Sequence, residues 1–144
     1  MKLRLMTPDG ALFEGDVLSV RGRAPGGEFE ILPGHAPWVS PLEICLLALG
    51  RLSADAQAGA RCELGMSFAV HGGLIEVGAD AVLVLADLAE APGDIDLERA
   101  ERAARRARER LSSGLTEDGG RIDADRARRA LARALVRIDS AGGR

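Results

Sequence analysis

AVLVLADLAEAPGDIDLERA, residues 81–100, divides the chain into two kinds of structure. Its first six residues are apolar and rich in Val and Leu, which predicts a strand buried on both faces. Pro92-Gly93 interrupts that pattern, and from Asp96 onward the apolar residues recur at helical spacing. The sequence therefore predicts an α+β chain of two domains, residues 1–91 built of strands and residues 92–144 built of helices.

Short strands separated by turns are the pattern of the first domain. Residues 60–70 alternate, with Cys62, Leu64, Met66, Phe68 and Val70 on one face. Turn signals recur from Pro8-Asp9-Gly10 to Gly72-Gly73, and this spacing is typical of an antiparallel sandwich or barrel. We therefore predict an N-terminal antiparallel β-sandwich. His71, directly before Gly72-Gly73, is interpreted as a turn residue at a strand end.

A helical hairpin is predicted for the second domain, with helices over residues 96–112 and 123–139. Their apolar stripes are Leu97, Ala100, Ala104, Ala107 and Leu111 in the first helix, and Ala124, Ala127, Leu131, Ala134 and Ile138 in the second. Asp96 and Asp123 are the expected N-caps, and the glycines between the helices let the chain reverse. Because Ala buries little area, we expect a weakly held hairpin that can move.

Charge is spread unevenly along the chain. Residues 1–93 hold 6 basic and 12 acidic side chains, whereas residues 94–144 hold 13 basic side chains, all Arg, and 10 acidic ones. This asymmetry favours an acidic or phosphorylated partner, although a solvated amphipathic hairpin accounts for most of these charges. The interleaved acids and a net charge of −3 argue against nucleic acid.

The sequence contains no pattern of an enzyme or a metal site. A P-loop needs a Lys after its glycines, and the only Lys is Lys2. The segment Gly65–Ala69 lacks the last glycine of a nucleophile elbow, so a hydrolase using Ser67 or His71 is disfavoured. Cys45 and Cys62 have no metal-binding spacing and are expected to be reduced. We therefore expect a protein that is not an enzyme and requires no cofactor.

Direct insertion into a membrane is not expected either. The longest apolar stretch, residues 44–49, is far too short to span a bilayer, so membrane association would run through a partner.

Six segments resemble, in order along nearly the whole chain, the epsilon subunit of bacterial F-type ATP synthases. They are MTPDGALFEGDV (6–17), GEFEILPGHAP (27–37), PLEI (41–44), HGGLIEV (71–77), VLVLADLAE (82–90) and IDLERA (95–100). The resemblance implies a non-catalytic subunit of the central stalk that contacts the gamma subunit, the c-ring and the alpha/beta catalytic head. Such a subunit couples proton flow to ATP synthesis, and its C-terminal helices inhibit ATP hydrolysis. It would be a peripheral membrane protein on the cytoplasmic face of the bacterial inner membrane.

The resemblance further implies that ATP is a regulatory ligand of the helices. The family motif I/L-D-x-x-R-A is complete in Ile95, Asp96, Arg99 and Ala100, and the further family positions are Glu90, Arg106, Arg133 and Arg137. Spacing supports this mapping, because residues seven apart or four apart share a helix face. A folded hairpin could converge these guanidinium groups on a polyphosphate. The alternative is that they are solvated and pair with Glu101, Glu109 or Asp139.

The GEFEILPGHAP segment is implied to meet the c-ring and gamma, with Glu28 and His35 on its contact face. Trp38 follows this segment and is interpreted as an interface anchor. Ordinary turn residues and partial burial of Trp38 under its own loop are the alternatives. The chain departs from the family at Glu30, where a small residue is usual, and in longer stretches at 50–60 and 112–121. A free-standing ATP-sensing or scaffold module is the competing function.

Overall fold

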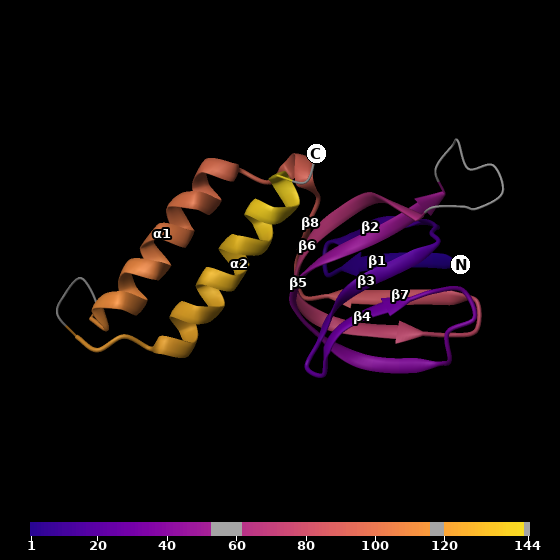
Figure 1. Cartoon of the computed structure of the whole chain (residues 1–144), viewed down its shortest axis with the longest axis horizontal. Coiled ribbons are helices and arrows are strands. Elements are labelled where there is room, and N and C mark those ends of the chain that lie inside the picture. The colour runs from indigo at the N-terminus through magenta and orange to yellow at the C-terminus, as the bar shows by residue number, and fades with distance from the viewer. Residues whose placement is uncertain (53–61, 116–119, 143–144) are drawn as a thin grey trace.

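The protein consists of a β domain and a helical hairpin joined at one end, as the computed structural model in Figure 1 shows. The structure describes residues 1–52, 62–115 and 120–142. The strands are β1 (Lys2–Thr7), β2 (Gly10–Asp16), β3 (Ser19–Ala24), β4 (Gly27–Ile31), β5 (Trp38–Leu52), β6 (Cys62–Val77), β7 (Ala81–Ala86) and β8 (Ala89–Glu90); a 3-10 turn, η1 (Pro92–Asp94), leads into the helices α1 (Leu97–Ser113) and α2 (Ala124–Gly142). The predicted α+β class and the order of its two parts are confirmed.

The strands form one sheet in the order β2-β1-β7-β6-β5-β3-β4, with β8 added beside β6. All neighbouring pairs are antiparallel except β1 and β7, which run parallel with Leu3 opposite Val82 and Leu5 opposite Val84. The expectation of a wholly antiparallel sandwich is therefore wrong for this pair. The first and seventh strands meet because the curved sheet brings both over the same core.

Alternation along the strands builds that core. Leu3 and Leu5 of β1, Phe68 and Val70 of β6, and Val82 and Val84 of β7 are all buried in it. The prediction that residues 81–86 are buried on both faces is wrong, because Leu85 is 45% exposed on the outer face. An apolar run therefore does not by itself identify a doubly covered strand.

β6 does not end at Gly72-Gly73, so His71 is not a turn residue. Both glycines have positive φ (102° and 130°), and at this point β6 exchanges one neighbour, β8, for another, β7. A Cβ on Gly73 would lie 2.1 Å from the carbonyl oxygen of Leu85, so only glycine allows this approach. The strand continues through both glycines without a shift of register against β5, and His71 lies inside the sheet.

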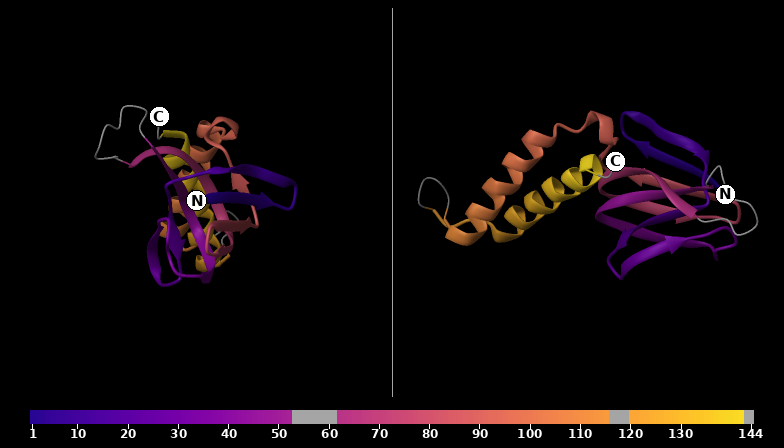
Figure 2. Two further views of the ribbon diagram at one scale, coloured as in Figure 1. Left: turned by 90° about the vertical axis from the view of Figure 1, so that its right-hand side faces the viewer. Right: turned by 45° about the horizontal axis from the view of Figure 1, so that its top comes forward.

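The two helices match the predicted hairpin closely, and α2 runs three residues further than expected. Asp96 and Asp123 are confirmed as N-caps, because their Oδ1 atoms accept hydrogen bonds from the backbone N–H groups of Arg99 (2.9 Å) and Arg126 (3.0 Å). Gly114 ends α1 in the left-handed conformation. Figures 1 and 2 show α2 next to the β domain and α1 on the side of α2 that faces away from that domain. No helix in the described part of the chain is long and apolar enough to cross a membrane.

Candidate functional site: an arginine-lined hairpin pocket and its joint to the sheet

A pocket of about 580 Å³ lies between α1 and α2, toward the loop end of the hairpin. The two helices line it with facing stripes of small residues and arginines. Its lining residues are Ala103, Arg106, Ala107, Arg110, Ile122, Asp123, Arg126, Ala127, Ala130 and Arg133. Arg106 and Arg110 are four residues apart and Arg126 and Arg133 are seven apart, so the helical repeat places the arginines of each helix on one face. The pocket is therefore walled by small side chains and rimmed by guanidinium groups from both helices.

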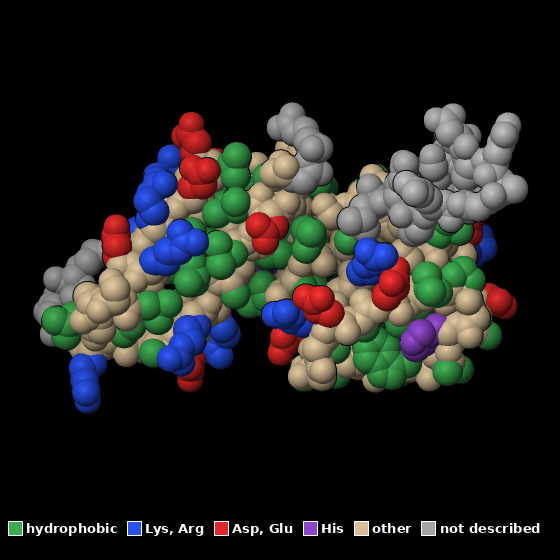
Figure 3. Space-filling model, in the orientation of Figure 1, with side chains coloured by type: hydrophobic (Ala, Val, Ile, Leu, Met, Phe, Trp, Pro, Cys, Tyr) green, Lys and Arg blue, Asp and Glu red, His purple; other side chains and the backbone are tan. Residues whose placement is uncertain are grey.

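The arginines of this pocket differ from those on the outside of the hairpin. On the outer surface, Arg102 pairs with Glu98 at 3.3 Å and Arg128 with Asp125 at 2.9 Å. Within the described residues, the guanidinium groups of Arg106, Arg126 and Arg133 have no such carboxylate partner. Figure 3 shows basic side chains, all of them Arg in this part of the chain, gathered along the hairpin. Unpaired guanidinium groups that face one space favour a multivalent anion.

The structure brings together some of the predicted nucleotide-binding residues and separates others. Arg106 and Arg133 line the same pocket, but Arg99 and Arg137 do not. Asp96 caps α1, Ala100 is buried in the hairpin, and Ile95 is partly buried next to η1. These three residues of the motif thus shape the start of α1.

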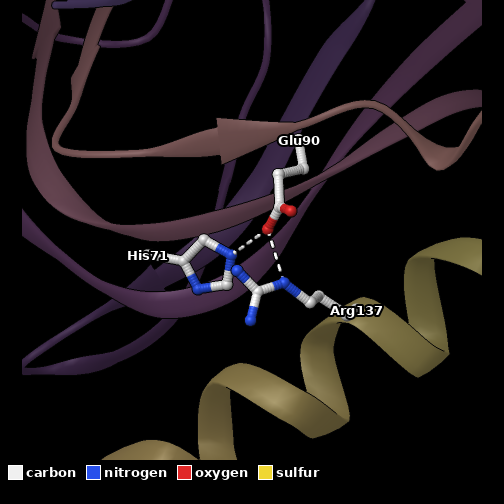
Figure 4. Close-up of polar contacts among 3 residues, drawn as sticks. All are labelled: His71, Glu90 and Arg137. Carbon is white, nitrogen blue, oxygen red and sulfur yellow. Dashed lines mark hydrogen bonds and ion pairs between the residues drawn. The ribbon is translucent and has the colours of Figure 1, made fainter. Parts of the chain in front are cut away.

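Glu90 and Arg137 meet at the joint between the sheet and α2. Arg137 Nε lies 2.6 Å from Glu90 Oε2, and the same oxygen is 2.7 Å from His71 Nε2. Figure 4 shows the three side chains converging from β8, α2 and β6. Arg137 therefore pairs with Glu90 and not with the carboxylates considered from the sequence. Sequence reasoning missed His71 as a member of this group, because its Gly-Gly neighbours resemble a turn.

The surroundings of these groups shift both pKa values downward. Burial is the main cause that lowers the pKa of His71, and the charges of Arg137 and Arg133 lower it further, against the hydrogen bond and charge of Glu90. Burial raises the pKa of Glu90, but the hydrogen bonds from Arg137 and His71 and the charges of these groups together outweigh it, and the net pKa is lowered. At neutral pH, Glu90 is therefore ionised and His71 is neutral.

The segment predicted to meet partners lies in β4 and the turn after it. Glu28 and Glu30 pair across the strands with Arg23 (3.3 Å) and Arg21 (2.7 Å), so Glu30 has a cross-strand partner in this chain. The His35 side chain is exposed, with Nδ1 2.7 Å from the carbonyl oxygen of Ala36.

Trp38 is half-buried at the start of β5. It packs edge-on against Phe29, with ring centroids 5.2 Å apart, and lies 6.4 Å from the ring of His35. This packing covers part of the indole and leaves part of it available to a partner.

A row of apolar side chains crosses the outer face of the same domain. Leu74 of β6 lies between Pro41 of β5 and Leu85 of β7, and Leu74 and Leu85 are 37% and 45% exposed. Val39, two residues before Pro41, is 60% exposed. Adjacent exposed apolar side chains on a rigid sheet are typical of a protein-binding surface.

Comparison with known proteins identifies the class to which this fold and hairpin belong. The model of the ATP synthase delta/epsilon chain beta-sandwich domain matches residues 1–92, and that of the long alpha-helix domain of the same chains matches residues 94–142. The chain therefore belongs to the ATP synthase delta/epsilon chain family.

Individual relatives show which member of this family the chain resembles. The ATP synthase epsilon chain of Bacillus licheniformis is 46% identical over 111 residues, covering 77% of both chains. That of Bacillus subtilis is 43% identical over 113 residues, covering 78% of both. The resemblance to the epsilon subunit is thus confirmed.

Solved structures share the fold. A chain of the Euglena gracilis mitochondrial ATP synthase (OSCP/F1/c-ring) has a TM-score of 0.70 at 21% identity, covering 96% of this chain and 79% of that one. A chain of the Tetrahymena thermophila central stalk and c-ring has a TM-score of 0.54 at 12% identity, covering 99% and 94%.

Proposed function

We propose that this chain is the epsilon subunit in the central stalk of a bacterial ATP synthase, a regulatory component that catalyses no reaction itself. Its partners are the gamma subunit, the c-ring and the alpha/beta catalytic head. It helps to couple proton flow to ATP synthesis. The support is a match of both domains to one family, together with relatives named as epsilon chains. The subunit would lie on the cytoplasmic face of the inner membrane, held there by its partners.

The β domain supplies the docking surface in this proposal. The exposed row Pro41, Leu74 and Leu85 presents apolar area that a stalk subunit would remove from water. Trp38 and the turn that contains His35 add an aromatic ring and polar groups at the start of β5, where Trp38 lies on the core-facing side of the strand, opposite to that of Pro41. Rigid strands hold these side chains in fixed positions, which reduces the entropy lost on binding.

The hairpin restrains ATP hydrolysis and responds to ATP. Folded, each helix is about 25 Å long; straightened over residues 96–139, the segment would reach roughly 65 Å. The observation that carries this part is the pocket that Arg106 of α1 and Arg133 of α2 both line. A triphosphate bridging two helices binds only while they lie together, so ATP favours the compact hairpin by its difference in affinity for the two states.

Calorimetric titration of the isolated chain with ATP tests this site. Arg106→Ala and Arg133→Ala each remove a charge-assisted hydrogen bond of about 1.5–3 kcal/mol, so each should weaken ATP binding about tenfold or more. Arg102→Ala removes an arginine on the outer surface and is the matched control. ATP affinity that is the same in all three variants and the parent chain would contradict the site.

Copurification distinguishes the proposal from the competing function, a free-standing ATP-sensing or scaffold module. The proposed subunit should copurify with a large ATPase complex from its own cell, whereas a free-standing module should not.

A further inference from the structure

We infer that His71, Glu90 and Arg137 form an intramolecular latch that holds the C-terminal half of α2 on the β domain, with Glu90 as its central acceptor. The latch consists only of groups of this chain, so it operates without nucleotide. Its effect on the motor rests on the proposed function, but its existence does not.

The sheet positions the first two members of the latch. Glu90 lies directly opposite Ala69 in the β6–β8 pair, and His71 is two residues further along β6 on the same face. A diagonal neighbour of this kind is within reach of a long side chain. Two backbone hydrogen bonds hold the segment between β7 and β8 against β6: His71 N–H donates to Leu88 O (2.9 Å) and Asp87 N–H donates to Gly72 O (3.1 Å). The sheet therefore holds the Glu90 carboxylate in a fixed position.

His71 orients that carboxylate as a neutral donor. Its side chain is only 3% exposed, and its Nδ1 has no hydrogen-bond partner among the described residues. A neutral ring with its proton on Nε2 donates to Glu90 and leaves Nδ1 as an unpaired acceptor. Protonation would add a buried N–H without an acceptor, facing the charges of Arg133 and Arg137. His71 is thus a positioning residue that acts through Glu90.

Arg137 connects the Glu90 carboxylate on the sheet to α2. It is 47 residues from Glu90 in sequence, and the chain between the two residues runs through η1, α1 and the loop, so the bond links parts that are far apart along the chain. Within the described residues, this is the ion pair that connects a helix to the sheet. Elsewhere in the joint, Ala132, Leu135 and Val136 of α2 lie beside residues of β3, β4 and β5 around a shared pocket. The charged bond adds a directional contact to this apolar one.

The joint is also suited to release. One helical turn beyond Val136, the hydroxyl of Ser140 is buried without a hydrogen-bond partner. This atom and His71 Nδ1 are the two buried side-chain polar atoms of the described residues that lack one. Both would regain hydrogen bonds to water when α2 leaves the sheet, which offsets part of the loss of the latch. These regained hydrogen bonds therefore lower the free-energy cost of breaking the latch.

The latch predicts how the hairpin behaves apart from its nucleotide pocket. Breaking it should free α2 from the sheet and leave Arg106 and Arg133 in place. Detached from the sheet, a 19-residue helix in a small hairpin is marginally stable, so its amide protons should exchange faster.

Hydrogen–deuterium exchange of the full chain without nucleotide is the test. Glu90→Gln and Arg137→Gln should each accelerate exchange in residues 132–142 at least about tenfold, and the double variant should add little to either, since one bond is lost in each case. Glu98→Gln, which removes the carboxylate of the exposed Arg102 pair, is the matched control and should leave α2 unchanged. Peptides of β1 and β7 report that the domain remains folded.

Wild-type exchange of α2 in both Glu90→Gln and Arg137→Gln would overturn the latch, as would additive effects in the double variant. Arg137→Gln lies outside the sheet, so it decides the question even if Glu90→Gln disturbs β8. A wild-type chain that fails to bind ATP would refute the proposed ATP response and leave the exchange result standing.

Discussion

The β domain and the hairpin are stabilised by different kinds of buried side chain. The largest fully buried residues are Leu, Ile and Val of the strands, such as Leu3, Leu47 and Ile75. Five of the seven buried residues of the helices are Ala, the others being Val136 and Ser140. Burying a Leu side chain contributes about 1.5–3 kcal/mol, and an Ala methyl group about a third of that or less. We therefore expect the β domain to be the rigid region, or platform, and the hairpin to be the region that can move.

The largest effect is expected in the platform. Leu47→Ala should destabilise the β domain by about 2–5 kcal/mol, because it leaves a cavity in a core that is fully enclosed. Chemical denaturation followed by circular dichroism measures the change. A loss below about 1 kcal/mol would mean that this core is loosely packed.

Acidification should loosen the joint before it affects the platform. The pKa of His71 is lowered from 6.5 in the compact state, so the stability it contributes is complete above pH 6.5 and is lost as the pH falls toward the lowered value. The lowered pKa of Glu90 acts in the same direction below its ordinary value of 4.5. The groups facing His71 are Glu90, Arg133 and Arg137.

Exchange protection of α2, corrected for intrinsic rates, should therefore decline below pH 6.5. His71→Gln keeps a donor near the position of Nε2 and cannot titrate, so in this variant the part of the decline that begins near pH 6.5 should disappear. If that part of the decline persists in His71→Gln, a group other than His71 causes it.

A smaller effect is expected within the hairpin. Ala104→Gly should destabilise α1 by about 1 kcal/mol through backbone entropy and lost packing, and leave the β domain unaffected. Exchange rates of α1 and of β1 measure the two regions separately. Equal acceleration in both would show that the two regions unfold as one unit.

The smallest expected signal is optical. Trp38, the only tryptophan, is half-buried, so its remaining exposed part should lose water when the chain joins the stalk. Its fluorescence should shift to the blue and become harder to quench on assembly. An unchanged spectrum in an assembled complex would remove its role as an anchor.

Sequence periodicity was sufficient for the elements that obey it and insufficient where contacts are non-local. The helices and both Asp caps follow from local spacing, which tertiary structure did not alter. The parallel β1–β7 pair and the outer exposure of Leu85 depend on how the whole sheet curves. No local pattern reports that.

The candidate site divides in the same way. Helical spacing indicated that Arg106 and Arg133 could converge, and they line one pocket. The bond between Glu90 and Arg137 spans 47 residues, and His71 joins it because β6 continues through Gly72-Gly73. Glu90 and Arg137 are both among the further family positions, but only the structure shows that the two side chains contact each other.

The most direct test of a fixed platform with a releasable regulator is a chain ending at Ala91, reconstituted into the ATP synthase complex. It retains the complete β domain with its exposed apolar row and lacks both helices. We predict that it binds the stalk and supports ATP synthesis, while ATP hydrolysis by the complex rises above that with the full chain. A folded, truncated domain that fails to bind the stalk, or a hydrolysis rate equal to that with the full chain, would contradict the division between platform and regulator.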